Sequence, residues 1–438
     1  MSKTYRPWNP SQSYLFPPSP RDWLPEDDLV YFLLDVTQTL DLTGIFWSYE
    51  AEARGFPPYH PRMMLTLLFY AYSLGVFGSR RIQTRCERDV AFRMIVGNDI
   101  PDFRTISDFR KRHLPEFQRL FVETVQLCRE AGLVKLGRLA LDGTKIKANA
   151  SRHKAMSYKR MLEEERRLKG EIAELLAQAE AVDTAEDQEH GRDRRGDELP
   201  AELARRASRL ERIAEAKRAL EERARTEARE AGEDPKKAQP KPTSQYNFTD
   251  PETRLMKVAN KGFDQCGNAQ AVVDGAHQVI VACAVTNECN DKQQWEPMVE
   301  QAKENLACGW KGLGAVIGDN GYYSEENVRW SEEKRLDVYL ATGKVKHNAR
   351  PVPAPRGRPP KGLSIKEQMQ RKLATLTGRA IYAQRKWIVE PVFGQTKRGR
   401  GFTQFLLNGM EKMEAEWALV CLTHNLLKFW RHAWAAGG

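Results

Sequence analysis

The spacing of the apolar residues changes once along the chain, near Leu136, and this change constrains the fold most strongly. Before Leu136, apolar residues recur every three or four positions, which predicts amphipathic helices. After it, short apolar runs alternate with amphipathic stretches, which predicts the strands and helices of a mixed α/β sheet. A chain of 438 residues is long enough for two or three domains. We therefore expect a helical N-terminal domain over residues 1–135 and an α/β core beyond it.

Four segments of the N-terminal domain carry the helical spacing, and several have recognisable ends. Pro61 suits a first helical position, because an N–H would have no helical partner there. Ser79 and Thr105 suit N-caps, and Gly132 suits a helix end. The four segments are DDLVYFLLDVTQTL, PRMMLTLLFYAYSL, SRRIQTRCERDVAFRMIVG and TISDFRKRHLPEFQRLFVETVQLCREAGL.

The chain carries a net charge of +10, with 69 Lys and Arg against 59 Asp and Glu. This excess suits a polyanionic partner, nucleic acid before membrane. Basic residues gather at positions 80–88 and 110–112. The N-terminal helices are therefore either a small DNA-binding bundle of helix-turn-helix type or an ordinary helical domain with solvated arginines. The most apolar run, 63–77, is too short to span a bilayer and predicts a buried helix.

The cysteines and the N-terminus bear on location. The seven cysteines form no CxxC pair and show neither zinc spacing nor a disulfide framework, which suits a reducing cytoplasm. The stretch MSKTYRPWNPSQSYLFPPSP has no apolar h-region and no small-residue cleavage site. We interpret it as a flexible arm rather than a signal peptide, and we expect a cytoplasmic protein.

The stretch from Ser157 to Lys241 differs in composition from the rest of the α/β region. It is rich in Glu, Arg, Lys and Ala and has almost no aromatic residues. Two apolar seams flank the polar run VDTAEDQEHGRDRRGDELP. This pattern predicts an antiparallel helical hairpin or short coiled coil inserted into the core, with a disordered spacer as the alternative. The seams are Leu168, Ile172 and Leu175, and then Leu203, Leu210, Ile213 and Leu220.

A second unusual stretch, VKHNARPVPAPRGRPPKG at 345–362, is Pro-rich and basic, which predicts a loop or an extended arm. Its central RGRPPK resembles an AT-hook. In that interpretation Arg356 and Arg358 enter a narrow minor groove, where the negative potential of A·T tracts attracts them. A solvated basic loop is the alternative.

Three acids stand where a charge is costly unless it is paired. Asp142 is expected at the end of the strand GRLALDGTKIKAN, and Asp319 follows the buried run GAVIG. Glu390 lies in a later segment that looks helical. A bound cation would remove the cost, and oxygen ligands without Cys or His nearby select Mg²⁺ or Mn²⁺. Two such ions would activate a water or a 3′-hydroxyl and stabilise the leaving oxygen in phosphoryl transfer.

Four other acids compete for this role but have turn-like settings. Asp250 stands beside a proline and Asp274 beside a glycine, so both are more naturally cap or turn residues. Asp264 and Asp291 have similar settings. We therefore leave all four out of the predicted site.

The surroundings of Glu390 combine cations with a helix break. Tyr382, Lys386 and Glu390 are four residues apart, so a helix would stack them on one face. Lys397 continues roughly that face two turns further on. Because the proline at 391 cannot donate to the preceding turn, the helix is expected to kink or restart there. An acid at such a break reaches a metal while the neighbouring lysines reach phosphates.

These motifs, taken in order, resemble those of the cut-and-paste DDE transposases of bacterial insertion sequences. The closest group has a long helical N-terminal domain, an RNase H-like core and a Tyr-Arg-Glu-Lys signature. The resemblance covers nearly the whole chain. It rests on YHPRMMLTLLFYAYSLGVFGSRRI, DVAFRMIVGND, PDFRTISDFRKRH, LDGTKIKANAS, NFTDPETRLMK, KGFDQCGNAQAVVDGAHQVIVA, GDNGYYSEEN, IVEPVFGQTKRGRGF and HNLLKF.

The resemblance implies that Asp142, Asp319 and Glu390 bind two Mg²⁺ or Mn²⁺ ions as a catalytic DDE triad. It implies cleavage at the terminal inverted repeats of a transposon and strand transfer into target DNA by the freed 3′-hydroxyl. It also implies an RNase H-like mixed-sheet core that an inserted hairpin interrupts. The expected parts are core residues 136–156, the hairpin and linker 157–241, core residues 242–405 and a C-terminal helix 406–438.

In such transposases the signature Tyr, Arg and Lys contact DNA near the cleaved end. Tyr382 and Lys397 fit this pattern. Arg385 lies one residue farther from Glu390 than the signature Arg, whereas Lys386 has the expected spacing but a different side chain, so the choice between them stays open. Further DNA contacts are expected from a set of basic residues near the acids, with solvated positions as the alternative for the last two: Arg398, Arg400, Lys145 and Lys147.

The expected partners are double-stranded DNA and a second copy of the chain, because joining two transposon ends needs a pair of active sites. The hairpin and the helix EKMEAEWALVCLTHNLLKFW are the segments suited to an oligomer. Simple packing of the second on the core is the alternative. Two other functions remain open: a metal-dependent nuclease without strand transfer, and a domesticated DNA-binding protein without activity.

Overall fold

The computed structural model describes residues 19–50, 57–97, 99–190, 201–230, 232–258, 262–343 and 353–437. The predicted N-terminal arm lies almost wholly outside these residues. So does the first half of the Pro-rich stretch.

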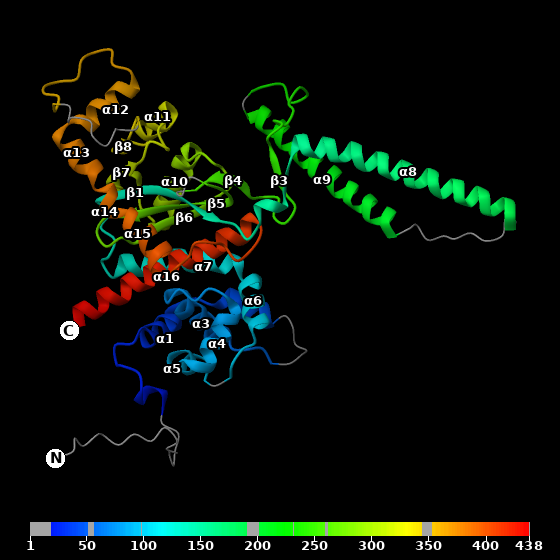
Figure 1. Ribbon diagram of the computed structural model, residues 1–438. Coiled ribbons are helices and arrows are strands. Elements are labelled where there is room, and N and C mark those ends of the chain that lie inside the picture. Colours follow the sequence, from blue (N-terminus) through cyan, green and yellow to red (C-terminus); the bar gives the residue numbers. More distant parts are fainter. Residues whose placement is uncertain are drawn as a thin grey trace, which may run out of the picture.

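The N-terminal part is helical, as the apolar spacing predicts (Figure 1). Pro61 is the first residue of its helix, and Gly132 follows the last helix with φ +75°, so both predicted ends are confirmed. The helices are α1 (Leu29–Thr39), α2 (Thr43–Glu50), α3 (Pro61–Ser73), α4 (Ser79–Arg88), α5 (Val90–Val96), α6 (Phe103–Arg112) and α7 (Leu114–Glu130), after a short η1 (Pro20–Asp22).

Two predicted caps of this region are wrong. Ser79 is already the first residue of α4, because the extended residue before it is Gly78. Helix α6 begins at Phe103 rather than after Thr105, because Asp102 accepts a hydrogen bond from Arg104 N at 2.8 Å. Asp102 thus caps the helix three residues earlier than expected.

The predicted buried helix of the apolar run is confirmed, since most residues of α3 are buried. Among the described residues, no single helix is long and apolar enough to cross a membrane. Helices α1 and α2 would pass that test only as a pair bent by 79°.

A mixed sheet forms the centre of the molecule, and its strands follow the order β4-β5-β1-β7-β8 with β6 also paired to β5. Strand β5 runs antiparallel to β1, β4 and β6, whereas β7 runs parallel to β1 and to β8. The predicted pair of strands around the turn at Gly275 is confirmed as β5 and β6. The strands are β1 (Arg138–Lys147), β4 (Arg254–Lys257), β5 (Phe263–Asp274), β6 (Ile280–Thr286), β7 (Ala315–Gly318) and β8 (Val338–Leu340).

Helices connect and follow these strands. Ser324 caps α11 by accepting a hydrogen bond from Asn327 N at 3.0 Å, as predicted. After β8 the chain forms a series of short helices along one side of the sheet (Figure 1). The elements are η3 (Lys292–Gln294), α10 (Trp295–Asn305), η4 (Trp310–Gly312), α11 (Glu325–Glu333), α12 (Ile365–Ala374), α13 (Leu376–Ala383), α14 (Arg385–Ile388), α15 (Glu390–Gly394), the π-helical η5 (Gln395–Gly399) and α16 (Met410–Gly437).

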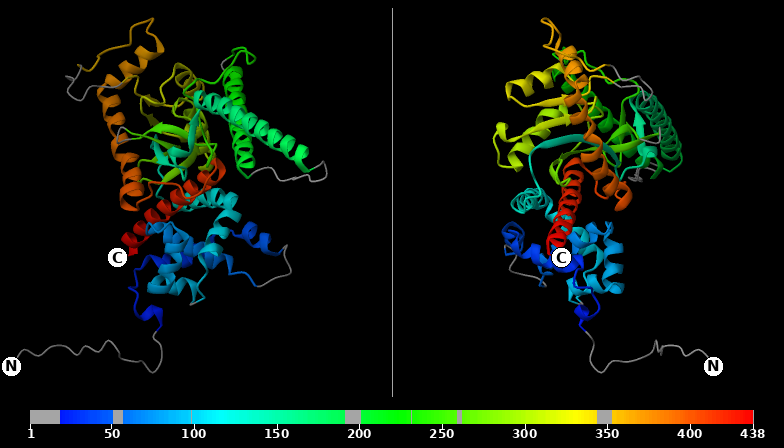
Figure 2. Two further views of the ribbon diagram at one scale, coloured as in Figure 1. Left: turned by 45° about the vertical axis from the view of Figure 1, so that its right-hand side comes forward. Right: turned by 90° about the vertical axis from the view of Figure 1, so that its left-hand side faces the viewer.

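Helix α16 joins the two halves of the molecule. It lies between the sheet and the N-terminal helices, against α7, α3 and β6 (Figures 1 and 2). Its residues Trp417, Leu419, Leu422 and Leu426 are fully buried, so this helix packs on the core of its own chain. One continuous apolar core runs from α1 to α16. The N-terminal helices and the sheet therefore share a core.

The predicted helical hairpin is confirmed as α8 (Tyr158–His190) and α9 (Ala201–Glu230), which project away from the rest of the molecule (Figures 1 and 2). The hairpin has a small core of its own around Leu168, Ile213 and Leu220. A two-stranded sheet of β2 (Ala155–Ser157) and β3 (Gln245–Asn247), absent from the sequence prediction, stands at its base. The polar run VDTAEDQEHGRDRRGDELP was expected to separate the two helices, but α8 includes its first residues and ends only at His190.

Candidate active site

The register of the sheet places Asp142 beside Asp319. Leu141 pairs with Gly318 at the last position of the parallel pairing between β1 and β7. The next residues are therefore Asp142 and Asp319, at the carboxyl end of β7. The prediction that Asp142 ends its strand is wrong. Asp142 lies in the middle of β1, because the antiparallel pairing with β5 continues to Lys147. Asp142 nevertheless borders the carboxyl end of β7, because the pairing of β1 with β7 stops one residue before it.

Arg385 links Glu390 to Asp142. Arg385 Nη1 lies 2.8 Å from Asp142 Oδ2, and Arg385 Nη2 lies 3.1 Å from Glu390 Oε1. The helix breaks between α14 and α15, and Pro391 opens the second piece, as predicted from the proline. This break orients Glu390 and Arg385 toward the sheet. Arg385, and not Lys386, contacts the acids, and Lys386 is exposed.

The carboxyl group of Asp142 is the most perturbed acid of the cluster. Its pKa is raised to about 7, chiefly by burial, while the charge of Arg385 opposes the rise and those of Asp319 and Asp291 add to it. Only 17 % of the side chain is exposed, so water screens these charges poorly. Negative charge at this place is thus only partly compensated by the protein.

Two of the predicted DNA-contacting lysines meet at β1: Lys145 belongs to this strand, and Lys397 reaches it from η5. Lys397 Nζ donates to Thr144 Oγ1 and to the carbonyl of Lys145, and burial lowers its pKa. Lys145 lies 3.4 Å from Asp291 Oδ1. Lys147 is half exposed and pairs with Asp264 at 2.8 Å. Lys145 therefore lies beside Asp291, Lys397 lies against β1 two and three residues beyond Asp142, and Lys147 pairs with Asp264 instead.

The remaining predicted DNA contacts lie in different places. Tyr382 is half-buried against Arg385, and Arg398 is exposed on η5. Arg356 and Arg358 are exposed in a loop whose carbonyls accept hydrogen bonds from Arg371, away from the acids. This loop has no helix or strand at its described residues, as predicted for the second half of the Pro-rich stretch.

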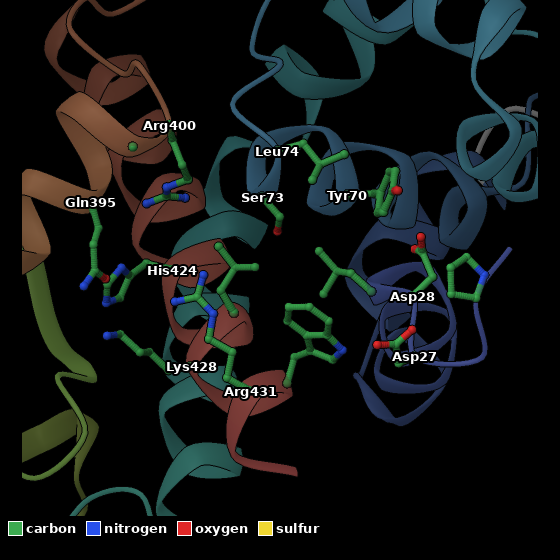
Figure 3. Close-up of a pocket in the computed structure, with 15 residues that line it drawn as sticks. Asp27, Asp28, Tyr70, Ser73, Leu74, Gln395, Arg400, His424, Lys428 and Arg431 are labelled. Atoms are coloured by element: carbon green, nitrogen blue, oxygen red, sulfur yellow. The ribbon is translucent and has the colours of Figure 1, made fainter. Parts of the chain in front are cut away.

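Arg400 does not face the acids. Its guanidinium donates to Val420 O and to Thr423 Oγ1, inside the protein, and burial lowers its pKa to about 10. The π-helical turn before it rotates the side chain inward. It lines a cavity of about 610 Å³ between the N-terminal helices, η5 and α16, where Lys428 and His424 lie on the same side and Asp28 lies across (Figure 3). None of the three predicted acids lines this cavity.

The turn interpretation is confirmed for two of the four competing acids, is incomplete for Asp291 and is wrong for Asp264, which lies inside β5 and pairs with Lys147. Asp250 accepts from Glu252 N, and Asp274 accepts from Ala276 N and Leu136 N. Asp291 lies in the loop between β6 and α10 with its side chain toward the acids. Its place depends on a long-range contact with β5, and no local sequence signal could have shown it.

The donor set suits a hard divalent cation. The groups are carboxylates without a histidine or cysteine among them, and the Arg385 guanidinium shows that a positive group is stable between Asp142 and Glu390. Within the described part of the chain, no three Asp, Glu, His or Cys side chains are already grouped as a metal site. A cation there would be held by Asp142, Asp319 and Glu390 once Arg385 turns aside.

Two family models match the chain. The family model described as Transposase DDE domain matches residues 238–426, and the one described as Transposase domain (DUF772) matches residues 18–112. The first match contains Asp319 and Glu390, whereas Asp142 lies between the two matched ranges. No curated protein and no solved structure matches the chain.

A mixed sheet that brings acids together at neighbouring strands suits metal-dependent phosphoryl transfer, and the matches supply the family. The chain carries a transposase DDE domain and a DUF772 transposase domain, which are typical of the transposases of insertion sequences, as the resemblance predicts. A DDE domain implies an enzyme that binds, cleaves and transfers DNA, generally with divalent metal ions.

Proposed function

We propose that this chain is the transposase of an insertion sequence that cleaves DNA at the terminal inverted repeats and joins the freed 3′-end to target DNA. The observation that carries the proposal is the convergence of Asp142, Asp319 and Glu390, from three separate segments, around one guanidinium. A structural role would leave fewer charges unpaired.

Each predicted residue has a role in this proposal. Asp142, Asp319 and Glu390 hold the metal ions, and Lys397 and Lys145 contact phosphates beside them. A divalent cation bound there supplies the charge that activates the attacking hydroxyl and stabilises the leaving oxygen. Arg385, released from the acids, binds a phosphate through its two Nη groups. The strand order, with β1 central, antiparallel to β5 and parallel to β7, supports an RNase H-like core.

The test is cleavage of a labelled duplex that carries the inverted repeat flanking the gene, in Mg²⁺, by the wild type and by Glu390→Ala. We expect nicking at the repeat boundary that needs the metal and is lost in the variant, while DNA binding remains. Lys386→Ala is the matched control, because Lys386 is exposed four residues before Glu390 and contacts none of the acids. A wild type that binds DNA and never cuts, with Mn²⁺ included, supports a domesticated DNA-binding protein instead.

A strand-transfer assay separates the transposase from a nuclease of the same fold. Pre-cleaved repeat ends with a 3′-hydroxyl are mixed with a supercoiled plasmid, and joined products are counted. Cleavage without joining contradicts the transposase proposal and favours the nuclease.

The proposed assembly is a dimer on DNA, acting on the chromosome in the cytoplasm. Two ends must be joined, so two active sites are needed. The hairpin α8–α9 is the segment that projects from the core. Light scattering after size exclusion, with and without end DNA, contradicts the dimer if both samples are monomeric.

A further inference from the structure

The two carboxylate oxygens of Asp291 differ: one accepts hydrogen bonds, and the other accepts none from the described residues. Its Oδ1 accepts hydrogen bonds from Asn268 Nδ2 at 2.6 Å and from Gln270 Nε2 at 2.9 Å, and Lys145 Nζ lies 3.4 Å away. Its Oδ2 accepts no hydrogen bond from the described residues. The carboxylate is therefore oriented through one oxygen and presents the other, as a carboxylate that binds a cation does.

The unengaged oxygen borders the same small space as Asp319. A Cβ built on Gly321 would lie 2.9 Å from Asp319 Oδ1 and 3.1 Å from Asp291 Oδ2. A Cβ built on Gly143 would lie 2.4 Å from Gln270 Nε2 and 3.1 Å from Asp291 Oδ1, so the Gln270 side chain already fills that position. Glycine at position 321 leaves the place between Asp291 Oδ2 and Asp319 Oδ1 without a side chain.

Asn268 gives a second, independent observation. The residue is fully buried, and its Oδ1 has no hydrogen-bond partner among the described residues. This oxygen lies 3.1 Å from the same Cβ position of Gly143. A buried acceptor without a donor is costly, and a water bound to a cation beside Asp291 would donate to it.

The charges also leave room for a second cation. Arg385 pairs with Asp142 and Glu390, and Lys145 pairs with Asp291. Asp319 has no basic partner within ion-pair distance in the described part of the chain. Because consecutive strand residues point to opposite sides, Asp142 and Gly143 open toward different sides of β1. Arg385 occupies the first side, and Asp291 borders the second.

We propose that Asp291 is a fourth carboxylate of the metal site and holds one divalent cation together with Asp319, beside Gly321. Mg²⁺ commonly uses one or two protein carboxylates and keeps several waters, so Asp291 Oδ2 and Asp319 Oδ1 suffice. Two cations then share four carboxylates. This inference rests on the proposed function and assigns a residue that the triad leaves out.

The test titrates Mn²⁺ into the full-length protein, with bound ions counted by electron paramagnetic resonance. The wild type is expected to bind two ions per chain, and Asp291→Asn to lose one or to bind it at least tenfold more weakly. Asp264→Asn is the matched control, because Asp264 is similarly exposed (26 % against 23 %) and pairs with Lys147 instead. Its Mn²⁺ binding is expected to equal that of the wild type.

Cleavage with Asp291→Cys gives a second readout. A thiolate prefers softer metals, so this variant is expected to cut better in Mn²⁺ than in Mg²⁺, relative to the wild type. Melting temperatures without metal identify a variant that fails to fold. Wild-type Mn²⁺ binding in Asp291→Asn overturns the inference, even if cleavage falls, because Asp291 then only positions its neighbours. A wild type that neither binds Mn²⁺ nor cuts overturns the proposed function itself.

Discussion

Two clusters in this molecule each combine an arginine with carboxylates, and they differ in how their charges are satisfied. Arg110, between the N-terminal helices, donates to Tyr72 Oη at 2.8 Å and to Phe77 O at 2.9 Å. Glu416 of α16 accepts from Leu406 N at 2.8 Å and completes the cluster through Tyr72. One cation and one anion are thus enclosed by neutral donors and acceptors.

The Arg385 cluster has the opposite balance. One guanidinium bridges Asp142 and Glu390, while Asp319 and Asp291 add two more carboxylates nearby. The glutamate is 47 % exposed, so the cluster is open to solvent on that side. The comparison teaches that a balanced, enclosed network stabilises the fold, whereas surplus charge in an open network prepares the site for a ligand.

The largest effect is expected when a carboxylate of the Arg385 cluster is removed. Asp319→Asn should lower cleavage at least about 1000-fold, because several kcal/mol of charge stabilisation in the transition state are lost. The free energy of unfolding without metal should rise by about 0.5–2 kcal/mol, since one unpaired carboxylate is removed. Single-turnover cleavage and urea denaturation measure the two effects.

Glu325→Gln is the control for Asp319→Asn, because Glu325 is an exposed acid of α11 that pairs with Arg329. It should change neither quantity. A variant Asp319→Asn that is clearly less stable than the wild type would contradict the surplus of charge.

The enclosed cluster should respond in the opposite sense. Glu416→Ala leaves Arg110 buried without its anion and should lower the free energy of unfolding by about 3–5 kcal/mol. The folded fraction should keep its activity per molecule. Glu411→Ala, at the exposed start of the same helix, should change stability by no more than about 0.5 kcal/mol. Urea denaturation measures both variants, and equal losses would remove the distinction between the clusters.

Acid should weaken the N-terminal region through His113. Burial lowers the pKa of His113 to about 4, with the charge of Arg112 adding to the effect. The folded state thus holds the histidine neutral while the unfolded chain protonates near pH 6.5. Its contribution is complete above pH 6.5 and is lost as the pH falls toward 4, by about 3 kcal/mol.

The measurement for His113 is the melting temperature against pH between 7 and 4. His113→Gln should flatten this dependence, because the amide does not titrate. The buried His424, whose pKa also lies well below its usual value, leaves part of the slope in place. An unchanged slope in His113→Gln would show that His113 is not the titrating group.

The smallest effect is expected where charge pairs are exposed, on the hairpin. Lys169 Nζ lies 2.7 Å from Glu165, but its side chain is 62 % exposed. Lys169→Ala should lower the free energy of unfolding by only about 0.3–0.5 kcal/mol. Urea denaturation at low and high salt checks this, and a loss above about 1 kcal/mol would place this pair with the enclosed cluster.

Local pattern was enough to predict much of this molecule. Apolar spacing of three and four predicts α3, and alternation with a Gly turn predicts β5 and β6. Ser324 was identified as a cap because its hydrogen bond reaches only three residues along the chain. Where caps were wrong, the helix begins earlier than expected. Asp102 caps α6 in place of Thr105, and Gly78 precedes α4 without a side-chain cap, so that Ser79 is already helical.

Contacts between distant segments decided what the pattern could not. Asp142 was expected at a strand end, yet β5 extends its strand for five residues, and only the stop of β7 creates the edge. Asp291 reads locally as a turn residue, and hydrogen bonds from β5 orient it toward the acids. Arg400 stands in a basic run, and the π-helical turn directs it inward.

The sequence by itself determined which elements form and which acids are available, because helix period, strand alternation and end caps act over a few residues. The tertiary structure alone decided which cation faces those acids and which further acid joins them. Arg385 and Lys386 are neighbours of similar charge on a broken helix. Arg385 binds Asp142, whereas Lys386, one position further on, is exposed. Such a choice depends on distances across the sheet, which no local spacing encodes.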